Sequence, residues 1–357
     1  MSRIIRSIDL FAGAGGLSLG FDLANDELDG LRYEPVFAVE HDPAAALTYK
    51  TNFGVGVYDG DIEGFDPITY PEAEIIVGGP PCQGFSPLGR DRDDKSRAQL
   101  NALWEHYLAA VVQVEPLAFV IENVPEFQKS SEFDALCHRL ASHPLLREYG
   151  YGFGVLNAVD YGVPQSRRRG IFVAVRGKEV QWPPPPTHGD GPIGQDRIRT
   201  VRDAIGDLPP IPTTDQPVMK DGFQDLHIRR NPRPTSLERY RAIPEGGNRF
   251  DLQRARPDLT PACWANKPTG TTDVMGRLWW DKPCFTIRTE FYKPEKGRYL
   301  HPSEDRPITH REAARLQTFP DTFEFAGTKI EIARQIGNAV PPLLGKAIAL
   351  HLAKLLG

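Results

Sequence analysis

The segment that most constrains the fold joins an apolar strand to a rigid turn that ends on a cysteine. It covers residues 75 to 86 and reads Ile-Ile-Val-Gly-Gly-Pro-Pro-Cys-Gln-Gly-Phe-Ser. The β-branched residues at its start are typical of a strand that is buried on both faces. Gly78 and Gly79 permit unusual backbone angles, and the two prolines after them fix φ. A thiol at the carboxyl end of a parallel strand lies where open α/β sheets bind their ligands.

Cys82, which ends this turn, is therefore predicted to be a positioned nucleophile. A small buried hydrophobe is the commoner role for a free cysteine. That role requires neither the Gly-Gly-Pro-Pro turn before the thiol nor the polar segment at 83–86 after it. The remaining cysteines are widely spaced without a CxxC pair, so the pattern indicates neither a zinc site nor a disulfide framework, which is typical of a reducing cytoplasm. They are Cys137, Cys263 and Cys284.

Length and charge limit the classes of function that fit. A chain of 357 residues is long enough for two domains, and no stretch approaches the roughly 18 consecutive apolar residues of a membrane span. The net charge of -5 argues against a general nucleic-acid coat, but positive charge is sorted locally. Segment 162–178 contains arginine and lysine and no acid, and segment 227–256 contains eight arginines against three acids. Such segments are either solvated surface or a face that contacts phosphates.

The N-terminal region predicts a strand at 4–10 and a glycine-rich turn at 11–20 that opens a helix. Backbone N–H groups in such a turn can approach an anion or a nucleotide, and the helix dipole adds to the attraction. The turn differs from the dinucleotide fingerprint GxGxxG, because Ser18 stands where the third glycine is required. A bound diphosphate is therefore disfavoured, and a plain tight turn remains the alternative.

Acidic residues follow the next two predicted strands. The strand near 35–39 ends at Glu40, where a carboxylate can accept hydrogen bonds from a ribose diol. The strand near Val55 ends at Asp59-Gly60-Asp61-Ile62, which offers an acceptor to the exocyclic amine of a purine. Each acid alone is the kind of residue that caps a helix or lies in a solvated loop. Their repetition at successive strand ends predicts an adenosyl pocket without a diphosphate.

Further elements complete the predicted sheet. A helix at 98–114 precedes an apolar strand at 116–121, and Glu122 comes directly after that strand, where it can act as an acid. Segments 151–160 and 170–175 are typical of a β-hairpin, joined through an arginine cluster at 167–169. From about Gly177 the sequence becomes rich in turn residues, with a proline run at 183–186, and has few long periodic stretches. A domain boundary is therefore expected near Gly177. Helices are predicted again from Thr309, which has capping-box spacing, and after Pro342.

Taken in this order, the segments resemble the DNA (cytosine-5)-methyltransferases that use S-adenosylmethionine, in their compact bacterial restriction-modification form. The resemblance covers nearly the whole chain. The motifs that carry it are Asp9-Leu-Phe-Ala-Gly-Ala-Gly-Gly16, Glu40, Gly60-Asp61-Ile62, Gly79-Pro-Pro-Cys-Gln-Gly-Phe-Ser86, Glu122-Asn123-Val124, Gln165-x-Arg167-x-Arg169, Arg311-Glu312 with Arg315-Leu-Gln-Thr-Phe-Pro320, and Gln335-Ile-Gly-Asn-Ala-Val-Pro-Pro342.

This resemblance implies an α/β fold: a Rossmann-like, mostly parallel sheet that binds S-adenosylmethionine, with a smaller, irregular target-recognition domain. The implied domains are a catalytic and cofactor-binding domain at 1–176, a target-recognition domain at 177–305, and a C-terminal segment at 306–357 that completes the catalytic domain. No metal is implied.

The resemblance also assigns residues to roles. The implied catalytic residues are Cys82, Glu122, Arg167 and Arg169. The implied cofactor-binding residues are Phe11, Ala12, Gly13, Gly15, Gly16, Leu17, Glu40, His41, Asp61, Ile62, Pro81, Asn338 and Ala339. The implied DNA-binding residues are Gln83, Ser86, Arg90, Arg168, Arg229, Arg230 and Arg233.

The expected partner is double-stranded DNA, and a restriction endonuclease that acts on the same site without a stable complex fits the same resemblance. The expected protein is a monomer of the bacterial cytoplasm, without a membrane. Three alternatives stay open at this point: an RNA cytosine-5 methyltransferase of the same fold, a DNA-binding or nucleotide-binding protein without catalysis, and a nicotinamide oxidoreductase, which Ser18 disfavours.

Overall fold

The computed structural model describes residues 2–81, 94–189, 196–220, 222–265 and 271–357, with backbone only for 94–102. The chain divides into two compact units. The first, here called the sheet unit, comprises 1–162, 167–196 and 340–357. The second unit comprises 163–166 and 197–339. Each unit is described by itself.

The sheet unit is organised around one large sheet. Among the described residues this sheet has seven strands in the order β3-β2-β1-β4-β5-β8-β6. Pairing is parallel from β3 through β5 and antiparallel for β8 with both of its neighbours. The prediction of a mostly parallel sheet is thus confirmed, as is the hairpin formed by β6 and β8. The strands are β1 (Arg3–Leu10), β2 (Leu31–Glu40), β3 (Gly56–Asp59), β4 (Ile75–Gly78), β5 (Ala118–Asn123), β6 (Tyr149–Asn157) and β8 (Arg168–Arg176).

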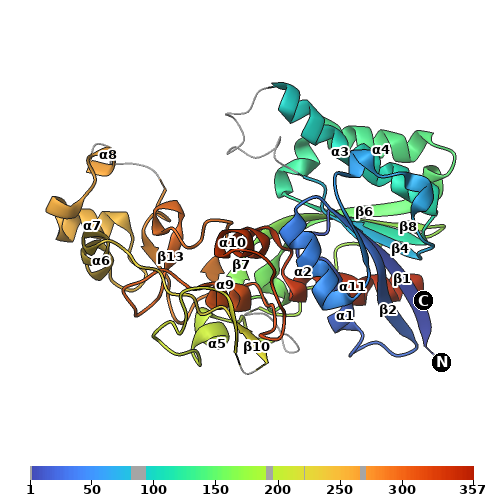
Figure 1. The fold of residues 1–357 in the computed structure, drawn as a ribbon. Coiled ribbons are helices and arrows are strands. Elements are labelled where there is room, and N and C mark those ends of the chain that lie inside the picture. Colours follow the sequence, from blue (N-terminus) through green and yellow to red (C-terminus); the bar gives the residue numbers. More distant parts are fainter. Residues whose placement is uncertain (1, 82–93, 190–195, 221, 266–270) are drawn as a thin grey trace. The chain divides into compact units, whose positions relative to one another are not determined.

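Helices cover both faces of this sheet. Figure 1 shows α3 (Asp94–Val114) and α4 (Ser131–Ser142) on one face, and α1 (Gly16–Ala24) with α11 (Pro342–Leu356) on the other. The core under α3 and α4 is rich in aromatic side chains, including Tyr107, Phe119 and Phe172. A fifth helix, α2 (Pro43–Phe53), follows β2. Burial of apolar area between these layers is the main favourable contribution to folding.

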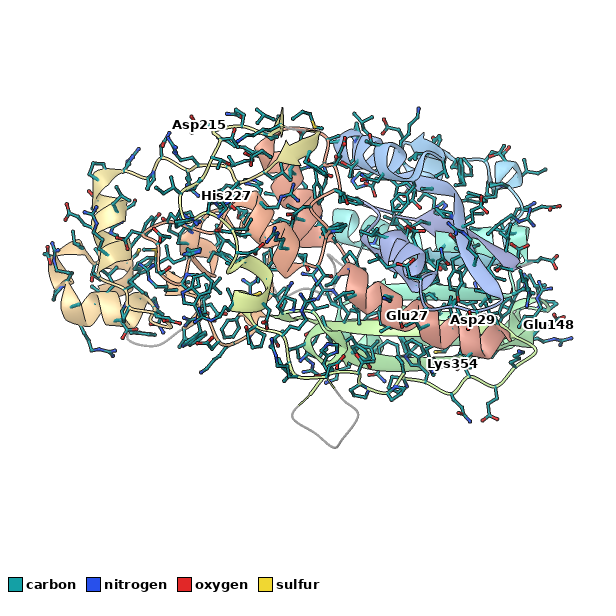
Figure 2. All side chains as sticks on the ribbon, turned by 90° about the horizontal axis from the view of Figure 1, so that it is seen from below. Glu27, Asp29, Glu148, Asp215, His227 and Lys354 are labelled. Carbon is teal, nitrogen blue, oxygen red and sulfur yellow. The ribbon has the colours of Figure 1, made fainter. Side chains whose placement is uncertain are left out.

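The C-terminal helix α11 packs against α1, although the two are far apart in sequence. The contact is close because both helices have glycine there: a Cβ on Gly20 would lie 2.5 Å from the carbonyl oxygen of Pro342 and 2.6 Å from Gly345. The pair is also tied at its end, since Lys346 forms an ion pair with Glu27 at 2.8 Å. Figure 2 labels Glu27 beside α11.

One stretch of the described chain, 329–356, is long and apolar enough to cross a membrane by length and composition alone. It consists of two separate helices, α10 (Lys329–Asn338) and α11, which Pro341 and Pro342 help to divide. In its most apolar window 61% of the residues are buried inside the protein. Such burial is what the core helices of a folded protein show, so the stretch is weak evidence for a membrane span.

The second unit has short elements and much irregular backbone. Its strand pairs are β9 with β10, β11 with β13, and β7 with β12, two strands each within the described residues. The elements are β7 (Gln165–Ser166), α5 (Val201–Ile205), β9 (Val218–Lys220), β10 (Phe223–Asp225), α6 (Pro234–Arg241), α7 (Arg249–Ala255), α8 (Ala262–Ala265), β11 (Gly276–Arg277), β12 (Cys284–Phe285), β13 (Arg298–Leu300), α9 (His310–Leu316) and α10.

Two buried arginines hold this irregular backbone together. The guanidinium of Arg277 donates to the carbonyl oxygens of Tyr240, Ile243, His301 and Glu304, and it pairs with Asp305. Arg298 likewise donates to the carbonyls of residues 246, 247, 272 and 277. Buried carbonyl groups outside regular ladders need such partners. The five N–H groups of a guanidinium can satisfy several carbonyls at once.

The boundaries of the units differ from the predicted ones at two places. Residues 177–196 belong to the sheet unit, where Lys178 donates to the carbonyl of Leu355 and Gln181 accepts from His351, both at 2.7 Å. Residues 306–339 belong to the second unit, where Arg311 donates to the carbonyl of Gln224 at 2.5 Å. The change of composition near residue 177 therefore does not coincide with the boundary between the two units.

Several neutral histidines are buried in the second unit. Burial lowers the pKa of His301 to about 4 and that of His310 to about 4, because the charged imidazolium would lose its hydration. Burial also lowers the pKa of His227, whose position in this unit is labelled in Figure 2. In the unfolded chain these side chains bind protons near pH 6.5. The contribution of these neutral histidines to the free energy of unfolding is therefore fully present above about pH 6.5, and it is lost as pH falls from 6.5 toward 4.

We expect His301 and His310 each to lower the free energy of unfolding, measured with urea, by about 2 kcal/mol between pH 7 and pH 5. A His301→Asn variant should show a shallower pH dependence, because it removes one group whose pKa differs between the folded and unfolded states. The exposed His138, replaced in the same way, serves as the control and should leave the slope unchanged. Equal slopes for all three proteins would contradict the assignment.

Candidate active site and cofactor-binding site

Glu122, one of the predicted catalytic residues, lies where β4 and β5 end. These strands pair in parallel, with Gly78 opposite Ile121, so the turn after β4 starts beside Glu122. A Cβ on Gly79 would lie 2.8 Å from Oε2 of Glu122, so a larger residue here would have to displace that carboxylate. Asn123 donates from Nδ2 to the carbonyl of Pro80 at 3.2 Å and so fixes the start of the turn.

The predicted nucleophile follows this turn in the sequence. Pro81 is the last described residue of the turn. Cys82, together with the predicted DNA-binding residues Gln83, Ser86 and Arg90, lies outside the described residues, so their roles stay predictions.

Glu122 lies within β5, one residue before its end, and not after the strand as the sequence suggested. Its Oε1 accepts from Nε of Arg169 at 2.6 Å, and both side chains are largely buried. Arg169 comes from β8, which runs antiparallel to β5 and places Gly170 opposite Asn123. The structure thus brings two of the four predicted catalytic residues together in a charge-assisted pair.

The two arginines that precede Arg169 in the chain differ in exposure. Arg167 is 1% exposed, and its backbone N–H donates to Oδ1 of Asn157 at 3.0 Å. Arg168, the first residue of β8, is exposed. Arg168 is thus available to a ligand such as a phosphate, whereas Arg167 is packed inside the sheet unit.

The glycine-rich turn between β1 and α1 has a left-handed backbone at three positions. Phe11, Gly13 and Gly15 have φ of 57°, 55° and 86°. Gly15 packs tightly, because a Cβ there would lie 2.9 Å from the ring of Tyr49 and would strike Phe53. Gly13 differs: a Cβ there would meet nothing within 4 Å, so the turn borders open space at this point.

Glu40 ties this turn to the neighbouring strand ends. Its carboxylate is 6% exposed and accepts from the backbone N–H groups of Gly13 and Asp42, each at 2.8 Å. Nδ1 of His41 lies 3.1 Å from the same carboxylate, and this hydrogen bond raises the pKa of His41. The carbonyl of Glu40 accepts from the N–H of Gly60 at 3.1 Å. Three loops of the predicted cofactor site therefore meet at Glu40.

Other predicted cofactor residues follow the same edge. Asp61 is exposed, and its Oδ1 accepts from the N–H of Glu63 at 3.2 Å, so it caps the short turn 62–64. Ile62 is buried beneath that turn. Asn338 and Ala339, at the end of α10, belong to the second unit.

The predicted DNA-binding arginines of the second unit are exposed. Arg229 and Arg230 line a pocket of about 230 Å³, together with the apolar side chains of Ile228 and Ile308. The guanidinium of Arg230 lies over the ring of Tyr292, at 5.6 Å from its centroid. Arg233 is also exposed and directly precedes α6. The three guanidinium groups are therefore accessible to an anionic partner.

Sequence reasoning missed two supporting contacts. Ser18, treated there as a departure from a glycine pattern, is buried and donates from Oγ to Oδ2 of Asp9 at 2.6 Å. Its position among apolar residues at the start of α1 was the available signal. Asn123 belongs to one of the motifs, but the motif does not indicate its hydrogen bond to the carbonyl of Pro80. That bond depends on the pairing of β4 with β5, which the sequence does not reveal.

Comparison with known proteins identifies the family of this chain. A family model described as C-5 cytosine-specific DNA methylase matches residues 5–354. The chain belongs to the C-5 cytosine-specific DNA methylase family. It is accordingly a DNA cytosine-5-methyltransferase of the restriction-modification type, as the resemblance predicted.

Two curated relatives illustrate the similarity of this family member. The type II methyltransferase M.AgeI of Thalassovita gelatinovora is 32% identical over 97% of this chain and 98% of its own length. M.XorII of Xanthomonas oryzae pv. oryzae is 34% identical over 100% of this chain and 86% of its own length. A solved structure of a candidate prophage-encoded DNA modification methyltransferase (E. coli) has a TM-score of 0.71 at 27% identity and covers 99% of both chains.

We expect Gly79→Ala to lower the rate of methyl transfer at least about tenfold, because an added methyl group would displace the Glu122 carboxylate, and misplacement by about 1 Å is costly in active sites. The measurement is the incorporation of labelled methyl groups into DNA. Gly64→Ala is the matched control, since a Cβ there would meet Tyr58 only at an ordinary 3.4 Å. An unchanged rate for Gly79→Ala would contradict the role of this contact.

Proposed function

We propose that the protein transfers the methyl group of S-adenosylmethionine to C5 of a cytosine that is flipped out of duplex DNA, through a covalent bond between Cys82 and C6 of the base. The single observation that supports it best is the Glu122–Arg169 pair beside the turn that leads to Cys82. The target is a short specific sequence, and its methylation protects DNA from a cognate restriction enzyme.

The chemistry explains these residue types. C5 of cytosine is a poor carbon nucleophile, so the ring needs activation before it can take a methyl group. Attack of the Cys82 thiolate on C6 supplies an electron pair to C5. S-adenosylmethionine, when bound, supplies an electrophilic methyl group. Loss of the C5 proton to a base then lets the C6–S bond break and restores both the aromatic ring and the thiolate.

Glu122 is proposed to contact the reacting ring. Its carboxyl group would hydrogen-bond N3 and the exocyclic amine and offset the charge that develops as the thiolate adds. Arg169 holds this carboxyl group in place through the 2.6 Å contact. Arg167 is proposed to support the same edge from inside the sheet unit, since it is buried and lies two residues before Arg169.

The described residues fit the proposed cofactor. The open space at Gly13 gives a ligand access to the backbone of the turn, and the buried Glu40 carboxylate borders the same turn. Glu40 would hold the ribose, and Asp61 with Ile62 would hold the adenine. The rest of the proposed binding set is Phe11, Ala12, Gly15, Gly16, Leu17, His41, Pro81, Asn338 and Ala339.

DNA contacts are proposed for the second unit and for the segment after Cys82. The exposed Arg168, Arg229, Arg230 and Arg233 suit phosphate contacts. Gln83, Ser86 and Arg90 would stabilise the flipped state, which costs a few kcal/mol. Residues 197–305 of the second unit would carry most of the sequence recognition. The proposal further includes a monomer in the bacterial cytoplasm and a restriction endonuclease that shares the site, in line with type II relatives such as M.AgeI.

Expression in a host without cytosine methylation, followed by mapping of 5-methylcytosine across the host DNA, tests the proposal. We expect modification within one short sequence for the wild-type protein. Cys82→Ala should abolish it while leaving DNA affinity within about tenfold, because phosphate contacts supply most of that affinity. Turnover by Cys82→Ala would exclude the covalent step. Unmodified DNA with the wild-type protein would redirect the search to RNA, with labelled cofactor as the assay.

Glu122→Gln should slow methyl transfer by about 10²-fold or more, the usual range for general acid catalysis. Glutamine keeps the size of the side chain but loses the ion pair with Arg169. Single-turnover measurements from pH 6 to 9 would separate this loss from a change in binding. A normal rate at every pH would remove Glu122 from the mechanism.

A further inference from the structure

Asp9 is a buried carboxylate without a cationic partner. It lies in β1, two residues before Phe11, and is 2% exposed. Among the described parts of the chain, no lysine, arginine or histidine forms an ion pair with it. A buried carboxylate is normally paired, because its removal from water costs several kcal/mol. Its presence next to the glycine-rich turn therefore needs an explanation.

A hydrogen bond from α1 holds Asp9 in place, and a residue of α2 supports its donor. Ser18, in the first turn of α1, donates to Oδ2 of Asp9 at 2.6 Å. The hydroxyl of Tyr49, on α2, lies 2.8 Å from the same serine oxygen. Tyr49 also packs against Gly15 of the turn. The network therefore joins β1, α1 and α2 around the turn proposed to bind the cofactor.

The groups that face Asp9 add negative charge. Burial raises the pKa of Asp9 to about 7, Ser18 lowers it, and the Glu40 carboxylate on β2 raises it further. Tyr49 on α2 and Tyr107 on α3 interact with the Asp9 charge, and both hydroxyls stay neutral because burial raises their pKa. His41 is the base that faces this region, but it pairs with Glu40 and is 73% exposed. The turn thus borders two carboxylates whose negative charge is little compensated by cations among the described residues.

We propose that Asp9 is the buried countercharge for the sulfonium group of S-adenosylmethionine, so that the site favours the cationic cofactor over the uncharged sulfur of the product. This inference rests on the proposed function. Methyl transfer removes the positive charge from sulfur and leaves a neutral thioether. Asp9 then loses its partner, which weakens product binding relative to the cofactor. Asp9 acts through charge and position, and takes no part in bond formation.

The proposal predicts a specific pH dependence. Without ligand, Asp9 exchanges its proton near pH 7. A cation nearby favours the ionised carboxylate, so binding of S-adenosylmethionine should release a proton at or below pH 7. Affinity for S-adenosylmethionine should therefore rise as pH increases through 7. Affinity for S-adenosylhomocysteine, whose sulfur is neutral, should change much less.

Calorimetry on the full chain with each of the two ligands, from pH 5.5 to 8.5 in buffers of different ionisation enthalpy, measures both affinity and proton release. For the wild-type protein we expect the ratio of the two dissociation constants to change by about tenfold over this range, in favour of S-adenosylmethionine at high pH. Asp9→Asn should weaken S-adenosylmethionine about tenfold and S-adenosylhomocysteine by less than about twofold, and should abolish the pH dependence. Asp22→Asn, an exposed carboxylate on the same helix as Ser18, should change neither.

Ser18→Ala gives a second test that keeps the charge. The hydrogen bond from Ser18 lowers the pKa of Asp9, so its loss should move the midpoint of the pH dependence upward. An equal loss of affinity for both ligands in Asp9→Asn, or a wild-type ratio independent of pH, would overturn the proposal. If Asp9→Asn does not fold, the wild-type profile and the Ser18→Ala shift decide. A wild-type protein that binds neither ligand would instead refute the proposed cofactor, and with it the proposed function.

Discussion

Parallel pairing of the central strands is the constraint on which the site depends. Because β2, β1, β4 and β5 run in one direction, their carboxyl ends meet at one edge of the sheet. Residues that are far apart in the chain become neighbours there, as Gly79 and Glu122 do. The antiparallel β8 then brings Arg169 back along β5 to the same edge. One sheet edge thus carries an ion pair and a glycine turn that local sequence could not assemble.

Local patterns predicted the elements well and the contacts between them poorly. The β-branched run at 75–77 and the capping box at Thr309 each specify an element by nearest-neighbour effects, and both elements are present. The Glu122–Arg169 pair depends on the register of two antiparallel strands, which the sequence does not state. The role of Ser18 depends on its hydrogen bond to the buried Asp9, which lies on another element. The end of the sheet unit near 196 was missed because the proline run returns to that unit, where Tyr161 donates to the carbonyl of Pro184.

The two units satisfy the hydrogen bonds of their buried peptide groups in different ways. In the sheet unit the ladders of seven described strands satisfy most peptide groups. The second unit has few ladders, and buried guanidinium groups such as those of Arg277 and Arg298 bind its carbonyls. Because side chains supply these hydrogen bonds, the backbone does not need the regular geometry of a helix or a strand. Loops of varied length and sequence are therefore tolerated around fixed arginines, which suits a unit proposed to distinguish DNA sequences.

The contact between the two ends of the described chain has a consequence for how such enzymes are organised. Arg3, at the start of β1, donates to the carbonyl of Leu356 at the end of α11, at 3.4 Å, and Figure 1 marks both ends close together. A short linker could join them, and new ends could be opened in an exposed loop without changing the sheet. Circular permutation is therefore compatible with this fold. The proposed chemistry requires the motifs to meet at one edge of the sheet, whatever their order along the chain.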